Sequence, residues 1–470
     1  MNTSDGIKIP FKEKVAYGFG DFASSMFWKL FSMFLLFFYT DIFGISAAAV
    51  GTMFLVTRIW DAINDPMMGV ICDRTETRWG KFRPYLLFGA VPFAVIGIIT
   101  FSTPDLSPSG KLVYAYVTYT LMMMIYTVVN VPYSSLMGVM TNDPQERTSL
   151  ASFRFVGAFS GGILVTATAT YLVEYFGGKE NPAQGYQWTV GVYAVLAALF
   201  FLFTFAGTKE RLKPAGVKRS SLKDDLKDIS KNGPWFIMLA AGISILIFNS
   251  LRDGSILYYF KYFIKDRSLE IFGARYNFTQ AELASAYMTL WLATNIIGVI
   301  LAKPVSSLIG KKKTFMYAAL LSALLSVLLY FLQPDQLIAI FLLNILIGIS
   351  AGIVLPLIWS MYADIADYSE WKNGRRATGL IFSSSSMSQK FGWTLGGALT
   401  GWLLALFGFQ ANIEQTSESL LGIRLIISVI AGGGALLAAL FIFFYPLSED
   451  FMKKIETELE QKRNNNEETI

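Results

Sequence analysis

Two aspartates with an asparagine between them lie where charged side chains are costly. Asp61, Asn64 and Asp65 fall within an apolar run from about Ser46 to Cys72, which is long enough to cross a bilayer because a span takes about 20 residues. On a helix, residues three and four apart share one face. Two carboxylates one turn apart repel unless a cation lies between them or one is protonated. The pattern therefore predicts a cation pocket in a membrane helix, with a salt bridge to Arg58 or another buried basic residue as the alternative.

The composition excludes several kinds of catalytic and metal site. The chain has no histidine and a single cysteine, Cys72. A histidine-liganded metal, a Ser-His-Asp triad, a histidine proton relay and a disulfide framework are therefore excluded. The predicted loops are too short for a soluble catalytic domain. We expect a protein that is not an enzyme and holds no cofactor, and whose cation chemistry uses carboxylates, amines, hydroxyls and amides.

The chain is far more apolar than a soluble protein. Of its 470 residues, 54% are hydrophobic and 16% charged, with a mean hydropathy of +0.47, whereas soluble domains carry about 25% charged residues. The predicted fold class is an all-α membrane protein with twelve transmembrane helices. Their approximate ranges are 16–39, 46–72, 85–102, 112–140, 149–175, 188–207, 234–264, 281–302, 313–332, 336–363, 379–407 and 421–445.

Basic residues gather in alternate loops, and this pattern predicts the topology. They occur at the N-terminus and in segments 73–83, 208–231, 311–313, 372–376 and 453–454, while segments 40–46, 103–111 and 408–420 nearly lack them. The loop at 265–280, with three basic residues, fits the alternation less well. By the positive-inside rule, both termini lie in the cytoplasm and the number of spans is even. The net charge of +5 reflects this topology, and we expect no nucleic-acid partner.

The long polar stretch in the middle of the chain separates two similar halves. The predicted parts are a cytoplasmic N-terminus (1–15), a six-helix bundle (16–207), a cytoplasmic loop (208–233), a second six-helix bundle (234–445) and a cytoplasmic tail (446–470). In the tail we expect a surface helix at 447–462 and disorder from Arg463. The basic loop after span two recurs after span eight, at 310–313. Repeated six-helix halves are typical of transporters.

Several motifs are shared with one transporter family. The most specific is the run from Trp60 to Pro66 in span two, followed by Arg78-Trp79-Gly80-Lys81-Phe82. Weaker matches are spread over residues 16–445 and include 17–20, 39–41, 126–127, 154–155, 363–365 and 389–390. On these motifs the chain resembles the melibiose-permease group, the glycoside–pentoside–hexuronide:cation symporters of the major facilitator superfamily. The resemblance implies the major facilitator fold of two six-helix bundles, and symport by alternating access across the inner (plasma) membrane.

The resemblance also implies a set of cation ligands. In that family a coupling cation is held by the two aspartates of span two, the asparagine between them and a threonine of span four. Those positions are Asp61, Asn64, Asp65 and Thr127 here. Such oxygen ligands suit Na⁺, and the same set with one carboxylate protonated would couple to H⁺. The choice between the two ions stays open.

The substrate side of the resemblance is less complete. The family's arginine of span five is present as Arg154, but its acidic positions in spans one and four are Ser25 and Asn130. The acid of span one is instead Asp21, one turn earlier. These departures argue against a galactoside, while the remaining donors and acceptors suit another polyhydroxylated substrate, a sugar, glycoside or hexuronide. Arg154 suits a hexuronate carboxylate through a bidentate contact, or it forms a structural pair with Asp21.

Other side chains within the predicted spans complete the candidate site. Trp28 and Tyr126 are candidates for stacking on a sugar ring. Lys390 is a cation at membrane depth, where charges are usually functional. Arg252 and Asp253 match nothing in the family pattern, and adjacent residues on a helix point to different sides, so their role stays open.

Two other functions compete with sugar symport. A eukaryotic branch of the same fold moves lysolipids, but it would predict disulfides in the outer loops, and the chain has no second cysteine. A membrane-bound enzyme or sensor would need a soluble domain or a metal cluster. We therefore expect cation-coupled sugar or glycoside transport, with the substrate, the cation and the lipid bilayer as partners and no obligate protein partner.

Overall fold

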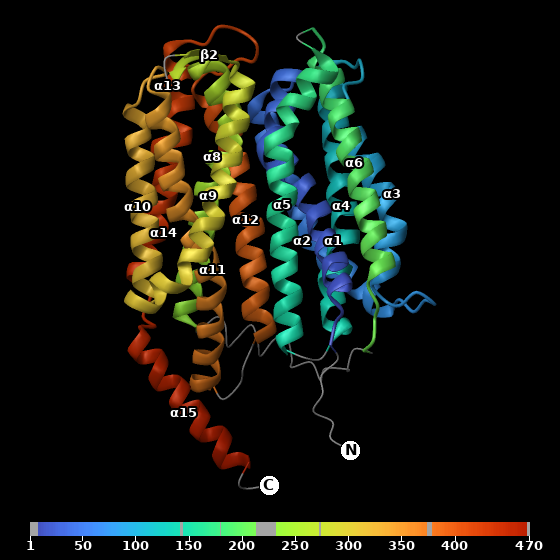
Figure 1. Ribbon diagram of the computed structural model, residues 1–470, viewed down its shortest axis with the longest axis vertical. Helices are drawn as coiled ribbons and strands as arrows, with labels where there is room; N and C mark the ends of the chain where they lie inside the picture. The colour runs from blue at the N-terminus through green and yellow to red at the C-terminus, as the bar shows by residue number, and fades with distance from the viewer. Residues whose placement is uncertain are drawn as a thin grey trace. The chain divides into compact units, whose positions relative to one another are not determined.

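The protein is described by a computed structural model that covers residues 8–141, 144–178, 180–212, 232–271, 274–373 and 378–467. Long helices make up nearly all of it (Figure 1). The chain forms two compact units. The first holds Met1–Gly216, Ile256–Thr289 and Gly401–Ser419, and the second holds Val217–Ser255, Leu290–Thr400 and Leu420–Ile470.

The helices of the N-terminal half all belong to the first unit. Helix α1 (Phe11–Lys29) continues through two π-helical segments, η1 (Leu30–Leu35) and η2 (Phe38–Ile42). It is followed by α2 (Ala47–Arg74), α3 (Arg83–Thr100), α4 (Pro108–Met140), α5 (Pro144–Gly177) and α6 (Pro182–Gly207). Helix α1 packs against α5 and α6, α2 against α4, and α3 against α4 and α6.

Local sequence signals begin several of these helices. Ser107 and Asn181 are the N-cap residues of α4 and α6, and each is followed by a proline at the first helical position. The Ser107 hydroxyl accepts a hydrogen bond from the Gly110 N–H at 3.2 Å. A side-chain cap satisfies a helix donor that has no partner within the helix, and proline at this position has no N–H to leave unpaired. The two helices begin four and six residues before the predicted spans, which started at about residues 112 and 188.

The C-terminal half contributes the remaining elements. Helix α8 (Gly233–Tyr258) continues as η3 (Tyr259–Ile264), and α9 (Gln280–Ile309), α10 (Lys311–Phe331), α11 (Leu337–Asn373) and α12 (Thr378–Leu406) follow. The last span comprises α13 (Ser417–Leu425), η4 (Ile426–Ile430) and α14 (Ala431–Phe443), and α15 (Glu449–Glu467) ends the described chain. In the second unit α10 packs against α11 and α14, and α15 contacts α11.

Most of the predicted membrane spans coincide with long apolar helices in the described part of the chain. In the described ranges, nine helices are long and apolar enough to cross a membrane, and they coincide with predicted spans three to ten and span twelve. The other three predicted spans coincide with α1 to η2, with α2 and with α12, which carry more charged and polar side chains. The protein is thus an all-α, multi-pass membrane protein.

Two regions differ from the predicted loops and tail. The loop at 265–280 contains an antiparallel hairpin of β1 (Arg267–Ile271) and β2 (Ala274–Phe278), with Arg267 opposite Phe278. The helix of the tail continues to Glu467, so the disorder expected from Arg463 was wrong over those five residues.

A carboxylate holds the turn between α2 and α3. Glu210, which follows α6, accepts hydrogen bonds from the backbone N–H groups of Lys81, Phe82 and Arg83 at 2.8, 2.8 and 2.9 Å. Gly80 precedes them with a φ of +110°, and a Cβ there would lie 2.5 Å from the carboxylate of Glu210. Glycine is thus required at position 80 both by its backbone conformation and by this close approach.

The second unit repeats this arrangement. Glu449, which follows α14, accepts a hydrogen bond from the N–H of Lys311 at 2.6 Å. Gly310 has a φ of +85°, and a Cβ there would lie 2.7 Å from the Cγ of Glu449. The two units therefore share a structural feature. In the first, Glu210 binds the start of α3, and in the second, Glu449 binds the start of α10.

Replacing Gly80 by alanine tests this arrangement. Gly80→Ala should lower the free energy of unfolding by about 1–3 kcal/mol, because the side chain is forced into a disfavoured φ and displaces Glu210. Gly191→Ala is the matched control, since a Cβ at this position in α6 meets no heavy atom within 4 Å. Thermal unfolding of the purified variants in detergent measures both. Equal midpoints for the two variants would contradict the assignment.

Candidate cation and substrate site

Close packing of α1 against α5 brings the first pair of predicted site residues together. A Cβ on Gly157 would lie 2.1 Å from the carbonyl oxygen of Gly18, and a Cβ on Gly161 would lie 2.3 Å from that of Phe22. Only glycine permits two helix backbones to approach so closely, a common way of packing helices in membranes. At this crossing Asp21 of α1 meets Arg154 of α5.

Asp21 and Arg154 form an ion pair. Arg154 donates from Nε to Asp21 Oδ2 at 2.5 Å and from Nη2 to Oδ1 at 3.4 Å. The side chains are 16% and 25% exposed, so the pair is largely shielded while part of each group can still be reached. The guanidinium carbon also lies 5.0 Å from the centroid of the Tyr133 ring. The sequence had left open whether Arg154 would be paired with Asp21, and the structure makes this pair.

Two tyrosines fix α1 against α4 beside the ion pair. The rings of Tyr17 and Tyr133 stack with centroids 4.9 Å apart. The hydroxyl of Tyr133 donates to the backbone carbonyl of Tyr17 at 2.7 Å, and the hydroxyl of Tyr17 donates to that of Tyr133 at 3.4 Å. Both tyrosines are fully buried. The reciprocal bonds hold Asp21, one turn after Tyr17, in a fixed place.

Further along α1, a hydroxyl and an amide meet. Ser24 donates to the Oδ1 of Asn130 at 2.8 Å, and the Nδ2 of Asn130 donates to the carbonyl of Tyr126 at 3.0 Å. Ser25, the position that the family pattern gave as a substrate contact, is the half-buried neighbour of Ser24. Nothing in the sequence distinguishes the two serines, since the choice depends on how α1 is rotated against α4.

The two predicted aromatic residues lie side by side. The rings of Trp28 and Tyr126 have centroids 6.1 Å apart, and Phe93 of α3 lies 6.2 Å from Tyr126. Trp28 and Tyr126 are half-buried. Such a pair combines ring faces for stacking on a sugar with a polar N–H and hydroxyl.

The predicted cation ligands come from α2 and α4. Thr127 donates to the Oδ1 of Asp65 at 2.9 Å, and Thr127 and Asn64 are 4% and 8% exposed. The Nδ2 of Asn64 is buried, and it has no hydrogen-bond partner among the side chains that the structure describes. The side chain of Asp61 lies outside the described residues.

Helix α4 is common to both groups of side chains. Thr127 faces Asp65 of α2, and Asn130, three residues later, faces Ser24 of α1. Residues three apart lie one turn from each other on one side of a helix. A displacement of α4 toward α2 would therefore move Asn130 as well.

Lys390 and Arg252, two charged residues singled out from the sequence, belong to the second unit. Lys390 is half-buried on α12. Arg252 is 1% exposed and donates to the carbonyl of Ile427 at 3.2 Å and to the Oδ1 of Asn344 at 3.2 Å. Its guanidinium carbon lies 4.9 Å from the ring centroid of Trp291. Arg252 thus binds the π-helical segment η4 to α8 and is a packing residue of this unit.

Sequence reasoning missed a network around Asp41, at the end of η2. The Oδ1 of Asp41 accepts hydrogen bonds from Lys261 at 2.7 Å and from the hydroxyl of Tyr262, and its Oδ2 accepts one from Thr40 at 2.7 Å. Asn412 joins the network by donating to the Asp41 carbonyl at 2.5 Å. The Asp41 carboxylate is fully shielded. The partners lie 220 and 371 residues away in the chain, so no local pattern could reveal them.

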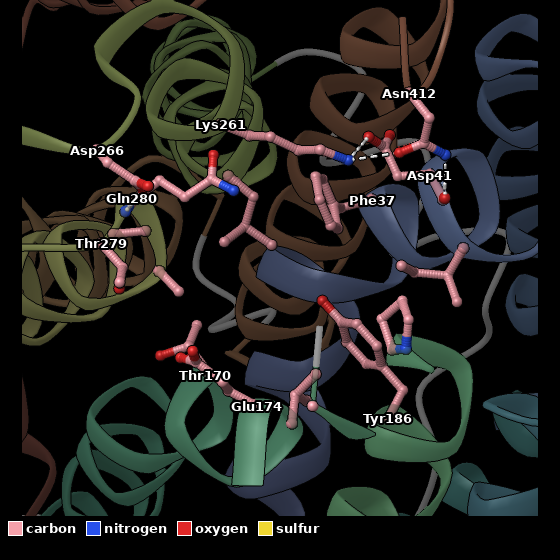
Figure 2. Close-up of a pocket in the computed structure, with 17 residues that line it drawn as sticks. Phe37, Asp41, Thr170, Glu174, Tyr186, Lys261, Asp266, Thr279, Gln280 and Asn412 are labelled. Atoms are coloured by element: carbon pink, nitrogen blue, oxygen red, sulfur yellow. Dashed lines mark hydrogen bonds and ion pairs between the residues drawn. The ribbon is translucent and has the colours of Figure 1, made fainter. Parts of the chain in front are cut away.

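This network forms one wall of a cavity of about 600 Å³ (Figure 2). The other walls come from the end of α5, with Thr170 and Glu174, and from the start of α9, with Thr279 and Gln280. Figure 2 shows Lys261 extended across the top of the cavity to Asp41 and Asn412. Polar and apolar side chains thus share the lining.

Comparison with known proteins relates the whole chain to membrane transporters. A family model described as "MFS/sugar transport protein" matches residues 16–449. The inner membrane symporter YicJ of Escherichia coli is 39% identical over 96% of this chain and 95% of its own length. The isoprimeverose transporter of Lactiplantibacillus pentosus is 37% identical over 97% and 92%. The crystal structure of the nucleoside transporter NupG has a TM-score of 0.62 with 15% identity, covering 93% of this chain and all of that one.

The shielded carboxylate of Asp41 should contribute to stability. Asp41→Asn should lower the free energy of unfolding by about 1.5–3 kcal/mol, the usual worth of a hydrogen bond to a charged group, because Lys261 loses its ion pair. Glu174→Gln, an exposed position on the opposite wall of the cavity, is the control and should leave stability unchanged. Thermal unfolding in detergent compares the two, and an unchanged midpoint for Asp41→Asn would refute the expectation.

Proposed function

Because this chain belongs to the MFS/sugar transport protein family, we propose that it is a secondary active transporter that carries a sugar or glycoside together with a cation by alternating access. The observation that carries the proposal is the arrangement along α4. One turn of this helix joins the Asp65–Thr127 contact to the Asn130–Ser24 contact. Related symporters that match nearly the whole chain support the same function.

The proposed architecture has twelve spans in two bundles of six, residues 16–207 and 234–445, with both termini in the cytoplasm. Nine apolar helices in the described part of the chain support it, and α1 to η2, α2 and α12 would supply the other spans. The alternation of basic loops supports the orientation. Residues 1–15, 208–233 and 446–470 would then lie on the cytoplasmic side of the inner membrane.

Labelling of single cysteines tests the orientation. In a Cys72→Ser background, a cysteine at Ser220 should react with an impermeant thiol reagent only from the cytoplasmic side. A cysteine at Ser107, the N-cap residue of α4, should react only from the other side. Reaction of both positions from the same side would contradict the topology.

The proposed cation site consists of Asp61, Asn64, Asp65 and Thr127. Burial of Asn64 and Thr127 and the Thr127–Asp65 contact support it. Carboxylate, amide and hydroxyl oxygens are hard ligands and can replace much of the hydration shell of Na⁺. The same carboxylates could instead take up a proton, because two anions one turn apart favour protonation of one of them. The coupling ion is thus Na⁺ or H⁺.

The proposed substrate site lies along α1, α4 and α5. Asp21, Ser25, Asn130 and Arg154 would supply donors and acceptors for sugar hydroxyls, and Trp28 and Tyr126 would stack on the ring. Lys390, from the second unit, is proposed as a further substrate contact. Geometry supports the first group through the contacts Arg154–Asp21 and Asn130–Ser24.

Coupling follows if the cation draws α2 toward α4. The bound cation cancels the repulsion between Asp61 and Asp65, and the movement of Thr127 carries Asn130 with it. Cation and sugar should then raise each other's affinity by the same factor, as linkage requires. The sugar site remains distinct, so sugar binding can persist when the cation site is lost.

Neutralising either aspartate tests the cation site. In Asp61→Asn and Asp65→Asn, sugar affinity should no longer respond to Na⁺ or to pH, while some sugar binding persists. Asp335→Asn, in the exposed loop between α10 and α11, is the control and should keep the full response. The measurement is the affinity of purified protein for a panel of glycosides with and without Na⁺ at several pH values. Undiminished coupling in both variants would refute the assignment.

A further inference from the structure

We infer that Asp21 selects the charge of the substrate: by neutralising Arg154 it fits the site to uncharged glycosides and disfavours hexuronides. The inference rests on the proposed function and names the substrate class for the same site. Asp21 is not one of the family's substrate-binding positions. The family has an acidic residue at the position of Ser25, and Asp21 lies one turn before it.

The geometry of the ion pair uses the part of Arg154 that a carboxylate would need. Nε and Nη2 form one edge of the guanidinium, and both donate to the two oxygens of Asp21. This is the bidentate arrangement by which arginine recognises carboxylates. A substrate carboxylate that approached this edge would have to displace Asp21, and at any other edge it would meet a cation whose charge is already balanced.

The surroundings keep the pair in place before any substrate arrives. The backbones of α1 and α5 touch at Gly157 and Gly161, so the backbone positions of Asp21 and Arg154 are fixed relative to each other. The stacked Tyr17 and Tyr133, bonded to each other's backbone, hold α1 to α4 at the same level. Asp21 is therefore a fixed counter-ion, and a substrate carboxylate cannot readily take its place.

The ion pair remains partly exposed, and the polar side chains next to it on α1 and α4 are uncharged. Part of each side chain is exposed, 16% for Asp21 and 25% for Arg154. Ser24 and Asn130 present a hydroxyl and an amide, and Trp28 lies further along α1. Lys29, the next cation on this helix, has an interaction partner of its own. Uncharged hydroxyl groups match this lining, whereas a second carboxylate would repel Asp21 in a medium that screens charge weakly.

Removing the charge of Asp21 should reverse the preference. In Asp21→Asn the guanidinium of Arg154 stays largely buried and loses its counter-ion, which leaves an uncompensated charge. A hexuronide carboxylate then supplies the missing acceptor. Asp21 acts on the substrate through Arg154. The expected change is therefore in the ratio of affinities for neutral and acidic ligands. The ligand that most raises the unfolding temperature should change as well.

The experiment compares ligands that differ only at the sugar C6. The probes are the 4-nitrophenyl α- and β-glucosides and the corresponding glucuronides, with isoprimeverose as a further neutral sugar, measured by binding and by uptake into proteoliposomes. The wild type should prefer a neutral ligand at least tenfold over its glucuronide. Asp21→Asn should shift that ratio at least tenfold toward the glucuronide, which should also raise its unfolding temperature more than that of the wild type.

Control variants separate charge from structure. Asp105→Asn removes the same charge from an exposed loop and should leave the ratio unchanged. The double variant Asp21→Asn/Arg154→Gln restores neutrality and should lose the gain for glucuronides. Should Asp21→Asn fail to fold, a wild type that binds glucuronides as well as the matched glucosides would still overturn the inference, and Asp21→Asn/Arg154→Gln, which has no unpaired charge, still tests the contribution of the pair.

Each outcome bears on one of the two claims. A wild type that binds glucuronides as well as the matched glucosides, or an Asp21→Asn variant with an unchanged ratio, would overturn the inference while leaving sugar transport intact. Uptake of none of the sugars would overturn the proposed function, and the inference with it. Uptake of neutral glycosides with the predicted shift in Asp21→Asn supports both.

Discussion

A charged group inside a bilayer has no water to solvate it, and this constraint governs the interior of the protein. The protein must supply a partner for each such charge. In the described residues Arg154 meets Asp21 within the predicted spans, whereas Lys261 meets Asp41 and Lys311 meets Asp364 near the ends of predicted spans. Each pair joins two different helices or helical segments. The same contacts that satisfy the charges therefore also fix which helices are neighbours.

An ion pair fixes two side chains in a defined geometry only when the helix backbones that carry them are also fixed. Around Asp21 that support comes from glycines and tyrosines, which carry no charge. Gly157 and Gly161 allow contact between backbones, and Tyr17 and Tyr133 bond reciprocally across α1 and α4. The polar groups of the candidate substrate site are thus positioned by packing, which makes the site rigid on the side formed by α1 and α5.

The sequence was sufficient for the helices but only partly for the site. The spans could be predicted because a long apolar segment in a membrane almost always forms a helix. Some helix starts, such as Ser107-Pro108 at the start of α4, also carry local sequence signals. The pairing of Thr127 with Asp65 followed the family pattern. By contrast, the bond of Ser24 to Asn130 depends on how α1 is rotated against α4. The bond of Glu210 to the turn after Gly80 joins residues 127 to 129 apart in the chain. The hairpin of β1 and β2 likewise gave no signal strong enough to predict it.

The network around Asp41 has a consequence for the kinetics of any motion that separates η2 from η3. Lys261 and Tyr262, two neighbouring residues of η3, both donate to the Oδ1 of Asp41 in η2, so separating the two segments breaks both bonds. A step that parts these segments must break them together before water can replace them. Such a step has a large activation enthalpy, and its rate rises steeply with temperature even where the free energies of the two end states are nearly equal.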